Sequence, residues 1–415
     1  MKLTFLGGAS EVGKSSVLAE VEDTNIIFDS GLKLTEPPTG PEPTSRVDVA
    51  FLSHAHLDHC GNLPSLHRQH RMPVYATPVS FELSHMLQKD SIKIDKIKGY
   101  DLKYTEQDMA RMTAGEIHVS PGRQYRFHNK FDFRFYDAGH IPGSAGILVD
   151  GGGKSVFYTG DTNAHDTRLL DKAQYPEHAD VVISESTYGN RSHPERRDVE
   201  AEFLKQVDET INGGGVALVP VFAIGRTQEI LLLLRDTDYT IYLDGMAKSA
   251  TQTILKYPDT VKDNEKLEEA AKSTIWVKGK RQRKKICEDS AVIVTTAGML
   301  AGGPVLDYLN HLHRDASSSI LLTGYQVEDT NGRLLVEKGY VIDEETQKRF
   351  DVNMTVKQYD FSAHSGKEEI VKTITDMNPE HVVLMHGDED AIESLKHEFG
   401  QKRVYTPKIG DTIEI

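Results

Sequence analysis

The sequence predicts an α/β protein in which a second domain, built on a parallel sheet, interrupts a first one. With 415 residues, the chain is too long for one ordinary hydrophobic core. Up to about residue 190 it reads as short strands and turns, whereas strands, glycine turns and helices alternate from about 195 to 350. After 350, histidines again follow strand-like segments, as they do in the first part. We therefore expect a first domain over 1–192, a second over 193–352 and a return to the first over 353–415.

The first domain carries several metal-ligand side chains between residues 53 and 61. The apolar run that ends at Leu52 predicts a buried strand, so these side chains lie in the loop that leaves it. In an extended segment His54, His56 and Asp58 project to one side, while His59 breaks the alternation and can face a second ion. Imidazole nitrogen and carboxylate oxygen are ligands that suit zinc. A single zinc ion that keeps one coordination position for water would not bind all four of these side chains. The spacing predicts a site for two ions, against the alternative of a solvated histidine-rich loop.

Further acids and histidines stand just beyond strand-like segments, where side chains from different strands can converge. They are Asp29, His140, Asp161, Glu185, His364 and His386. Taken singly, His140 or Asp161 fits an ordinary loop residue, and a lone histidine after a strand, such as His364 or His386, is usually structural. The ordered set points instead to one site.

The second domain is predicted from repeated strand and helix units. Apolar runs at 216–222, 240–243, 291–294 and 319–322 each precede a glycine-containing turn. Repeated βα units imply a parallel sheet with right-handed crossovers, and helix starts after such turns favour anions. No GxGxxG pattern follows any of these strands, which disfavours a dinucleotide-binding domain.

The composition of the chain disfavours membrane-spanning, secreted and disulfide-stabilised proteins. The chain is 38% hydrophobic and 27% charged, has no apolar run of the roughly 20 residues that span a bilayer, and starts without a signal-peptide pattern. We expect a cytoplasmic protein without membrane contact. Its two cysteines, Cys60 and Cys287, lie far apart in sequence, so no disulfide framework is expected.

The formal net charge of -15 argues against a protein that coats nucleic acid through bulk electrostatics. A polyanionic substrate would have to be held by local features. The strongest local feature is the basic run 278–285, which includes Lys280, Arg281 and Arg283. A solvated surface segment is the alternative for this run.

The pattern from His54 to His59, with its later partners, resembles the second motif of the metallo-β-lactamase superfamily. Glu185 in Ser-Glu-Ser, His364 in Phe-Ser-Ala-His-Ser and His386 in Met-His-Gly resemble motifs A, B and C of the β-CASP subfamily. Other stretches, among them 222–229, are similar to archaeal and bacterial homologues of the cleavage and polyadenylation specificity factor nuclease without an N-terminal KH extension. RNase J relatives share the catalytic motifs. The resemblance implies an αββα sandwich with an inserted β-CASP domain on a Rossmann-like parallel sheet.

The same resemblance implies roles for individual residues. His54, His56 and His140 would hold a first zinc ion, Asp58, His59 and His386 a second, and Asp161 would bridge the two. Asp29 would support the ligands, Asp58 would also take part in catalysis, Glu185 would orient a histidine, and His364 would approach the scissile phosphate as acid or hydrogen-bond donor. The substrate-binding candidates are Arg226, Ser249, Gly298, Lys280, Arg281 and Arg283.

The expected function is zinc-dependent hydrolysis of phosphodiester bonds in single-stranded RNA, with two Zn²⁺ per chain. We expect endonucleolytic cutting, with 5′-to-3′ trimming as a second activity. A 5′–3′ exoribonuclease of the RNase J type, a small-molecule metallo-hydrolase and a non-catalytic RNA-binding subunit are the alternatives. A homodimer is a possible oligomeric state that the sequence does not decide.

Overall fold

The computed structural model describes residues 1–343, 347–400 and 402–415, which form two compact units. The first unit comprises 1–166, 170–192 and 363–415, and the second comprises 167–169 and 193–362. The chain thus leaves the first unit, builds the second and returns. The second unit extends beyond residue 352 because β19 (Thr355–Gln358) pairs with its sheet. The domain limits expected from the sequence stay a prediction.

The first unit contains two seven-stranded sheets. The first sheet has the order β22 (Thr412–Glu414), β1 (Lys2–Gly7), β2 (Ser16–Val21), β3 (Thr24–Phe28), β4 (Val49–Phe51), β5 (Val74–Ala76), β6 (Glu116–His118). The second has the order β21 (Arg403–Tyr405), β20 (His381–Met385), β11 (Val181–Glu185), β10 (Lys154–Tyr158), β9 (Ala145–Gly151), β8 (Phe131–Asp137), β7 (Gln124–Phe127). Each sheet therefore combines strands that precede the second unit in sequence with strands that follow it.

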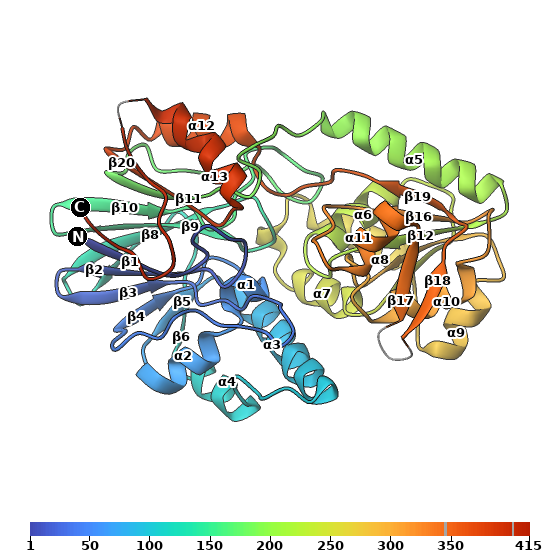
Figure 1. Ribbon diagram of the computed structural model, residues 1–415, viewed down its shortest axis with the longest axis horizontal. Coiled ribbons are helices and arrows are strands. Elements are labelled where there is room, and N and C mark those ends of the chain that lie inside the picture. The colour runs from blue at the N-terminus through green and yellow to red at the C-terminus, as the bar shows by residue number, and fades with distance from the viewer. Residues whose placement is uncertain (344–346, 401) are drawn as a thin grey trace. The chain divides into compact units, whose positions relative to one another are not determined.

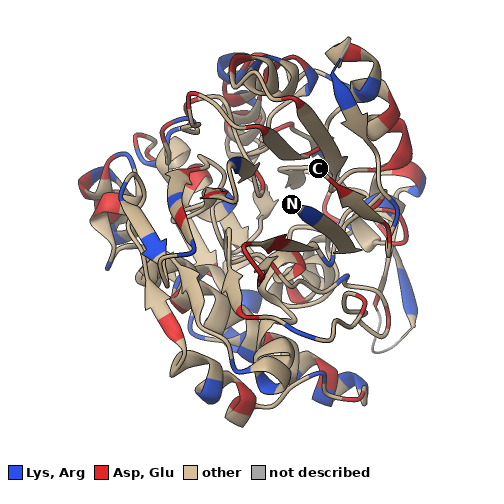
Figure 2. Ribbon diagram, turned by 90° about the vertical axis from the view of Figure 1, so that its left-hand side faces the viewer, with Lys and Arg blue, Asp and Glu red and all other residues tan. Residues whose placement is uncertain are grey.

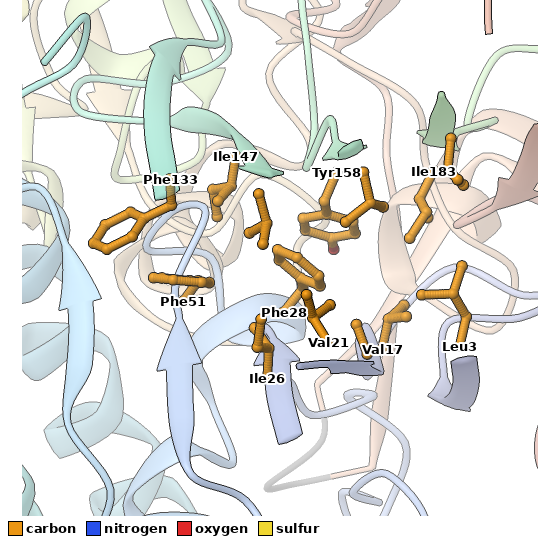
Figure 3. Close-up of a cluster of buried hydrophobic side chains, with 14 of the residues drawn as sticks. Leu3, Val17, Val21, Ile26, Phe28, Phe51, Phe133, Ile147, Tyr158 and Ile183 are labelled. Atoms are coloured by element: carbon orange, nitrogen blue, oxygen red, sulfur yellow. The ribbon is translucent and has the colours of Figure 1, made fainter. Parts of the chain in front are cut away.

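The two sheets pack face to face over an apolar core (Figure 3). Phe28 of β3 stacks on Tyr158 of β10, with ring centroids 5.2 Å apart, and Phe51 of β4 lies 4.8 Å from Phe133 of β8. Alternate residues of β8 are buried here, as expected for strands with one face on a core. This core fixes the strands whose ends carry the metal-ligand side chains.

Helices cover the outer faces of both sheets (Figure 1). On the first sheet lie α2 (Leu63–His70), α3 (Pro78–Lys98) and α4 (Glu106–Thr113), and on the second lie α12 (Lys367–Asp376), α13 (Glu389–Lys396) and η2 (His397–Phe399). Local signals set the limits of α3: the Thr77 hydroxyl accepts from the Ser80 N–H, and Gly99 ends the helix in a left-handed conformation. The predicted αββα sandwich is confirmed. Among the described residues, no helix is long and apolar enough to cross a membrane.

The second unit is a doubly wound parallel sheet. Its order is β14 (Ile275–Trp276), β13 (Ile241–Asp244), β15 (Ala291–Thr295), β12 (Val216–Pro220), β16 (Ser319–Leu322), β19, and every adjacent pair is parallel. Packed on one face are α5 (Arg196–Asn212), α6 (Arg226–Leu234), α7 (Ala247–Ile254) and α8 (Asn264–Ser273), and on the other α9 (Lys280–Ile286), α10 (Pro304–Leu312) and α11 (Asn331–Lys338). A hairpin of β17 (Tyr340–Asp343) and β18 (Lys348–Asp351) and a short η1 (Pro258–Thr260) complete the unit. The parallel sheet predicted from the sequence is confirmed.

The segment after β4 differs from the extended chain expected from the sequence. It stays extended only to His56, and a one-turn helix, α1 (Leu57–Cys60), follows. The Asp58 carbonyl of this turn accepts from the Ser15 N–H at 2.8 Å and lies so close to Gly31 that a Cβ there would come within 1.7 Å of it. Because the chain turns at Leu57, Asp58 does not continue the row of His54 and His56. The helix α2 that follows was also not anticipated.

Candidate metal centre

Among the described residues, three groups of ligand-type side chains lie in the first unit, and the third of them is Asp161 with Glu185 and His364. The first comprises His54, His56, His140 and Asp161. His56 Nδ1 lies 3.2 Å from His54 Nε2 and 3.1 Å from His140 Nε2, and Asp161 Oδ2 lies 3.5 Å and 3.7 Å from the same two Nε2 atoms. Four ligands tetrahedrally placed about 2.0–2.1 Å from one ion would be about 3.3 Å apart. The spacing of this group fits a zinc ion.

The second group comprises Asp58, His59 and His386. Asp58 Oδ2 lies 3.3 Å from His386 Nε2 and 3.9 Å from His59 Nε2. The other oxygen of Asp161, Oδ1, faces this group, at 3.3 Å from His59 Nε2 and 3.1 Å from His386 Nδ1. Asp161 therefore presents one carboxylate oxygen to each group.

All ten candidate residues of the centre lie in the first unit. They are Asp29, His54, His56, Asp58, His59, His140, Asp161, Glu185, His364 and His386. Most stand at or just beyond strand ends of its two sheets, whereas Asp58 and His59 lie in α1 and His364 lies in the segment before α12. Asp29 and His386 both have left-handed backbones, with φ of 57° and 49°. Such conformations in residues other than glycine are strained and persist where the surrounding structure requires them.

Hydrogen bonds outside the two groups select which histidine nitrogen faces inward. His59 Nδ1 lies 2.7 Å from Asp29 Oδ2, and His140 Nδ1 lies 2.7 Å from the Ala363 carbonyl. Both partners accept only, so these Nδ1 atoms carry the proton. His54 Nδ1 is likewise 3.0 Å from the Ser53 hydroxyl. The arrangement leaves Nε2 of all three rings with a lone pair for a metal, as in carboxylate–histidine–metal sites.

Asp29 is the anchor of this outer layer. Its fully buried carboxylate accepts from the Ser53 N–H at 2.7 Å and the Ser53 hydroxyl at 2.6 Å, besides His59. The Tyr158 hydroxyl, from β10 of the opposite sheet, donates to the same carboxylate at 2.9 Å. Sequence reasoning missed Ser53 and Tyr158, although each lies within three residues of a predicted ligand and either position could have been searched for a hydroxyl.

Electrostatics divide the histidines into two kinds. Burial lowers the pKa of His54 and His140 well below the ordinary value and that of His56 to about 4, so all three rings are neutral near pH 7. Burial also disfavours charge on His59 and His386, but Asp161 and Asp58 outweigh it and raise the pKa of both rings. His59 Nε2 and Asp161 Oδ1 are buried without a hydrogen-bond partner among the described residues. Buried polar atoms normally have a hydrogen-bond partner. Atoms without one, in a buried group of carboxylates and imidazoles, are consistent with a site that binds a cation.

Glu185 and His364 form a separate pair beside the first group. His364 Nδ1 lies 2.9 Å from Glu185 Oε2, and Glu185 Oε1 accepts from the Thr162 N–H at 2.6 Å. Burial disfavours the charged ring, but the Glu185 carboxylate raises the pKa of His364 to about 9. The His364 and His140 rings are 4.5 Å apart, so a protonated imidazole lies next to the candidate ligands.

The substrate-binding candidates all lie in the second unit. Arg226 begins α6 and donates to the Thr323 carbonyl, Ser249 is exposed on α7, and Gly298 follows β15. Figure 2 shows basic and acidic residues interspersed along helices and loops. The basic run forms α9, where Lys280 and Arg281 are exposed, but Arg283 pairs with Asp244 at 2.6 Å and Asp307 at 2.5 Å. Roles for these residues stay predictions.

Three family descriptions match successive parts of the chain: a β-lactamase superfamily domain at 24–211, a β-CASP domain at 227–335 and a Zn-dependent metallo-hydrolase RNA specificity domain at 349–407. The chain is 38% identical to a probable RNase MJ4 of Methanocaldococcus jannaschii, with all of both chains covered. The chain belongs to the β-CASP family of metallo-β-lactamase proteins. It is also similar to RNase aCSPSF2 of Saccharolobus solfataricus, 34% identical over 100% of this chain and 85% of that one.

Another relative is named for a different activity. The transcription termination factor FttA of M. jannaschii is 33% identical over 100% of this chain and 72% of that one. In fold, the β-CASP chain resembles the crystal structure of a protein of unknown function from Enterococcus faecalis V583, with a TM-score of 0.63, 14% identity and 99% of both chains covered. The family and the fold class predicted from the sequence are confirmed.

Proposed function

We propose that this β-CASP protein is a zinc-dependent ribonuclease that holds two zinc ions. The observation that carries the proposal is the pair of ligand groups that share Asp161, each of which presents histidine nitrogens and carboxylate oxygen at zinc spacing. The first ion would take His54, His56 and His140, and the second Asp58, His59 and His386. When bound, two such ions activate water near neutral pH and stabilise an in-line displacement at phosphorus.

The side chains around the ions would have distinct tasks. Asp29 orients His59, and through Ser53 it also supports His54. Glu185 keeps His364 protonated and fixes its ring through Nδ1, which leaves the Nε2–H for the substrate. A hydrogen-bond donor there can stabilise the charge on a scissile phosphate or protonate the leaving oxygen, a task worth roughly 10²–10⁴ in rate.

RNA is the proposed substrate because the chain matches a domain family described as an RNA specificity domain and resembles relatives named as RNases. The overall acidity of the chain means that the RNA must be held by local cations. We expect single-stranded RNA, cut internally, with 5′-to-3′ trimming as a second activity. An RNase J type exonuclease is the alternative.

A circular single-stranded RNA tests this proposal, because it offers no end to an exonuclease. The zinc-loaded protein should linearise the circle and then shorten it, while the His364→Ala variant, with equal zinc content, should not. If the circle survives while a linear 5′-monophosphorylated copy is degraded to mononucleotides, the RNase J type replaces the endonuclease. If neither RNA is cut by the zinc-loaded protein, the ribonuclease proposal is wrong.

A further inference from the structure

Helix α3 carries a row of fully buried polar side chains. Ser80, Ser84 and Gln88 follow one another at intervals of four residues, so they line one face of the helix, and all three are fully buried. Apolar side chains at these positions would pack against the first unit without the cost of burying a polar group. The row therefore indicates polar contacts with segments outside the helix.

The last member of the row, Gln88, contacts the short helix that carries two of the candidate ligands. Gln88 Nε2 donates to the Cys60 carbonyl at 2.9 Å, and Cys60 is the final residue of α1, directly after Asp58 and His59. The two helices lie side by side in the first unit (Figure 1). Gln88 Oε1 is buried without a hydrogen-bond partner among the described residues, so the amide makes its polar contact through the nitrogen.

The carbonyls of α1 depend on donors from other segments, because a helix of one turn pairs almost none of them internally. The Cys60 carbonyl would pair with the N–H of residue 64 if the helix continued, but Pro64 has no N–H. Within the described chain, its donor is the Gln88 side chain. The other three carbonyls receive backbone N–H donors at 2.8 Å: Leu57 from Leu32, Asp58 from Ser15 and His59 from Ser30.

The first turn of α3 holds the segment that carries His140. The Thr77 and Ser80 hydroxyls donate to the Gly143 carbonyl at 2.8 Å and 2.9 Å. Gly143 has a φ of 82°, and a Cβ there would come within 2.1 Å of the Val79 side chain, so this segment lies directly against α3. The segment follows β8 of the second sheet, whereas α1 follows β4 of the first. One helix therefore holds ligand-bearing segments from both sheets.

From these contacts we infer that Gln88 is a positioning residue of the second ligand group, and that α3 supports the two groups through separate polar contacts. The inference rests on the proposed two-ion site and deepens it. Gln88 acts through the backbone of α1: it fixes the end of the helix and, with it, the directions of Asp58 and His59. Without this bond the Cys60 carbonyl would turn toward another donor, and a cation would have to draw α1 back at a cost in affinity.

The test compares Gln88→Met with Ile92→Val in the full-length protein. Methionine is close to glutamine in length but cannot donate, whereas Ile92→Val removes one methylene from the same helix and no polar contact. Both should lower the free energy of unfolding to a similar extent. Only Gln88→Met should lower zinc affinity, by roughly 5- to 100-fold in a chelator competition, the range that an unpaired buried carbonyl allows. Equal affinities in the two variants would overturn the inference.

Two variant backgrounds identify the ion that depends on Gln88. His386→Ala removes a ligand of the second group and leaves the first intact, and His140→Ala does the reverse. Gln88→Met should weaken zinc binding in the His140→Ala background and leave it unchanged in the His386→Ala background. Ser80→Ala, which removes one of the two donors to Gly143, should show the opposite pattern with a smaller loss. Equal losses in both backgrounds, for either variant, would overturn the inference.

Co²⁺ in place of zinc gives a spectroscopic signature that a change in stability alone does not move. Its visible absorption depends on the number and geometry of its ligands. In the His140→Ala background, Co²⁺ reports on the second group, so Gln88→Met should change the spectrum and Ile92→Val should not. A spectrum that Gln88→Met leaves unchanged would contradict a positioning role.

If Gln88→Met does not fold, the wild-type protein decides. Coupling between two interactions is reciprocal, so an ion that binds more tightly because of the Gln88 bond must also strengthen that bond. Nuclear magnetic resonance measures the bond through hydrogen exchange of the Gln88 side-chain amide, which should be slower with both zinc ions bound than in the zinc-free protein. Exchange that zinc leaves unchanged would overturn the inference.

The failure of this inference is distinguishable from the failure of the proposed function. A protein that binds two zinc ions and cuts RNA, with zinc affinity independent of Gln88, would remain a ribonuclease with Gln88 as a packing residue. A protein whose second ion depends on Gln88 but that cuts no RNA would keep the positioning role and lose the ribonuclease. A wild-type protein that binds a single ion would remove both the two-ion site and the inference.

Discussion

Carboxylates raise the pKa of His364, and Glu185 contributes more to this than Asp161 and Asp58 do. Burial disfavours a protonated ring, yet Glu185 raises the pKa of His364 to about 9, above the ordinary histidine value of about 6.5. A raised pKa means that the protonated form persists through neutral pH and is lost as the pH rises through the folded-state value. A proton donor of this kind would keep its proton under physiological conditions.

We predict that Glu185→Gln moves the alkaline limb of the kcat/KM profile to lower pH. Glutamine keeps the carbonyl oxygen that accepts from Thr162 but removes the charge that holds the proton on His364. The measurement is a pH–rate profile on wild-type and variant proteins with equal zinc content. The His364→Ala variant serves as the control, because its profile should have no alkaline limb. An unchanged limb in Glu185→Gln would mean that another group carries the alkaline titration.

The Tyr158 hydroxyl should tune the metal site without touching a metal. It donates to the Asp29 carboxylate that orients His59, and partners of this kind typically change metal affinity by roughly 10- to 100-fold. Tyr158→Phe should lower zinc affinity by this factor in a chelator competition, while the ring stays packed on Phe28. Tyr75→Phe is the control, because its ring packs in the same core on Phe51 and Phe133. Equal affinities for the two variants would remove Tyr158 from the support of the site.

At the scale of elements, α9 shows that a run of like charges can contain residues with different tasks. The Arg283 side chain is 16% exposed and pairs with Asp244, which is 1% exposed, whereas the Lys280 side chain is 84% exposed. The Tyr308 hydroxyl also donates to Asp244. One cation of the run thus neutralises a buried acid at the end of β13, and others face solvent.

Substitutions along α9 should therefore separate stability from RNA binding. Arg283→Gln should lower the free energy of unfolding by roughly 1–3 kcal/mol, because a buried carboxylate loses its charged partner. In the double variant Lys280→Gln and Arg281→Gln, each substitution should change the free energy of unfolding by less than about 0.5 kcal/mol. If the exposed cations contact RNA, the double variant should also bind RNA with a weaker salt dependence. The slope of log affinity against log salt concentration should fall in magnitude by about 0.7 for each lost contact. Denaturant unfolding and a salt series are the two measurements, and an unchanged slope would make α9 a solvated helix.

At the scale of the whole molecule, the metal centre joins distant parts of the chain. The candidate ligands follow β4, β8, β10 and β20, so they come from both sheets and from both sides of the second unit in sequence. A cation bound there would hold the sheets together, and its binding would couple to folding. Asp161 and Asp58 raise the pKa of His59 and His386, so a cation bound there would compete with protons for these two rings.

We predict two zinc ions per chain, with His386→Ala and His59→Ala each losing one. Zinc binding should release protons, since the ion displaces them from His59 and His386, and affinity should therefore fall as the pH falls. Elemental analysis gives the stoichiometry, and calorimetric titration in two buffers of different ionisation heat gives the proton count. A single ion in the wild-type protein, unchanged in both variants, would contradict the two-ion site.

The sequence by itself determined the fold class, and it predicted the order of the two domains and the residue types of the candidate centre. Strand periodicity and strand-end positions are local properties, so the placement of His54, Asp161 or His386 just past a strand could be read without tertiary information. Repeated βα units likewise predicted the parallel sheet of the second unit. The resemblance to the β-CASP family, carried by ordered motifs, added the expected ligand roles.

Only the tertiary structure decided how these side chains combine. The contact of Tyr158 with Asp29 joins positions 129 residues apart, and that of His140 with the Ala363 carbonyl spans 223. The turn at Leu57, which separates Asp58 from His54 and His56, depends on the close approach of Gly31. The pairing of Arg283 with Asp244 likewise depends on which segments pack together. Sequence patterns report the local period of a chain, whereas these contacts arise from long-range packing of elements, and that packing sets the distances, burial and pKa on which the chemistry depends.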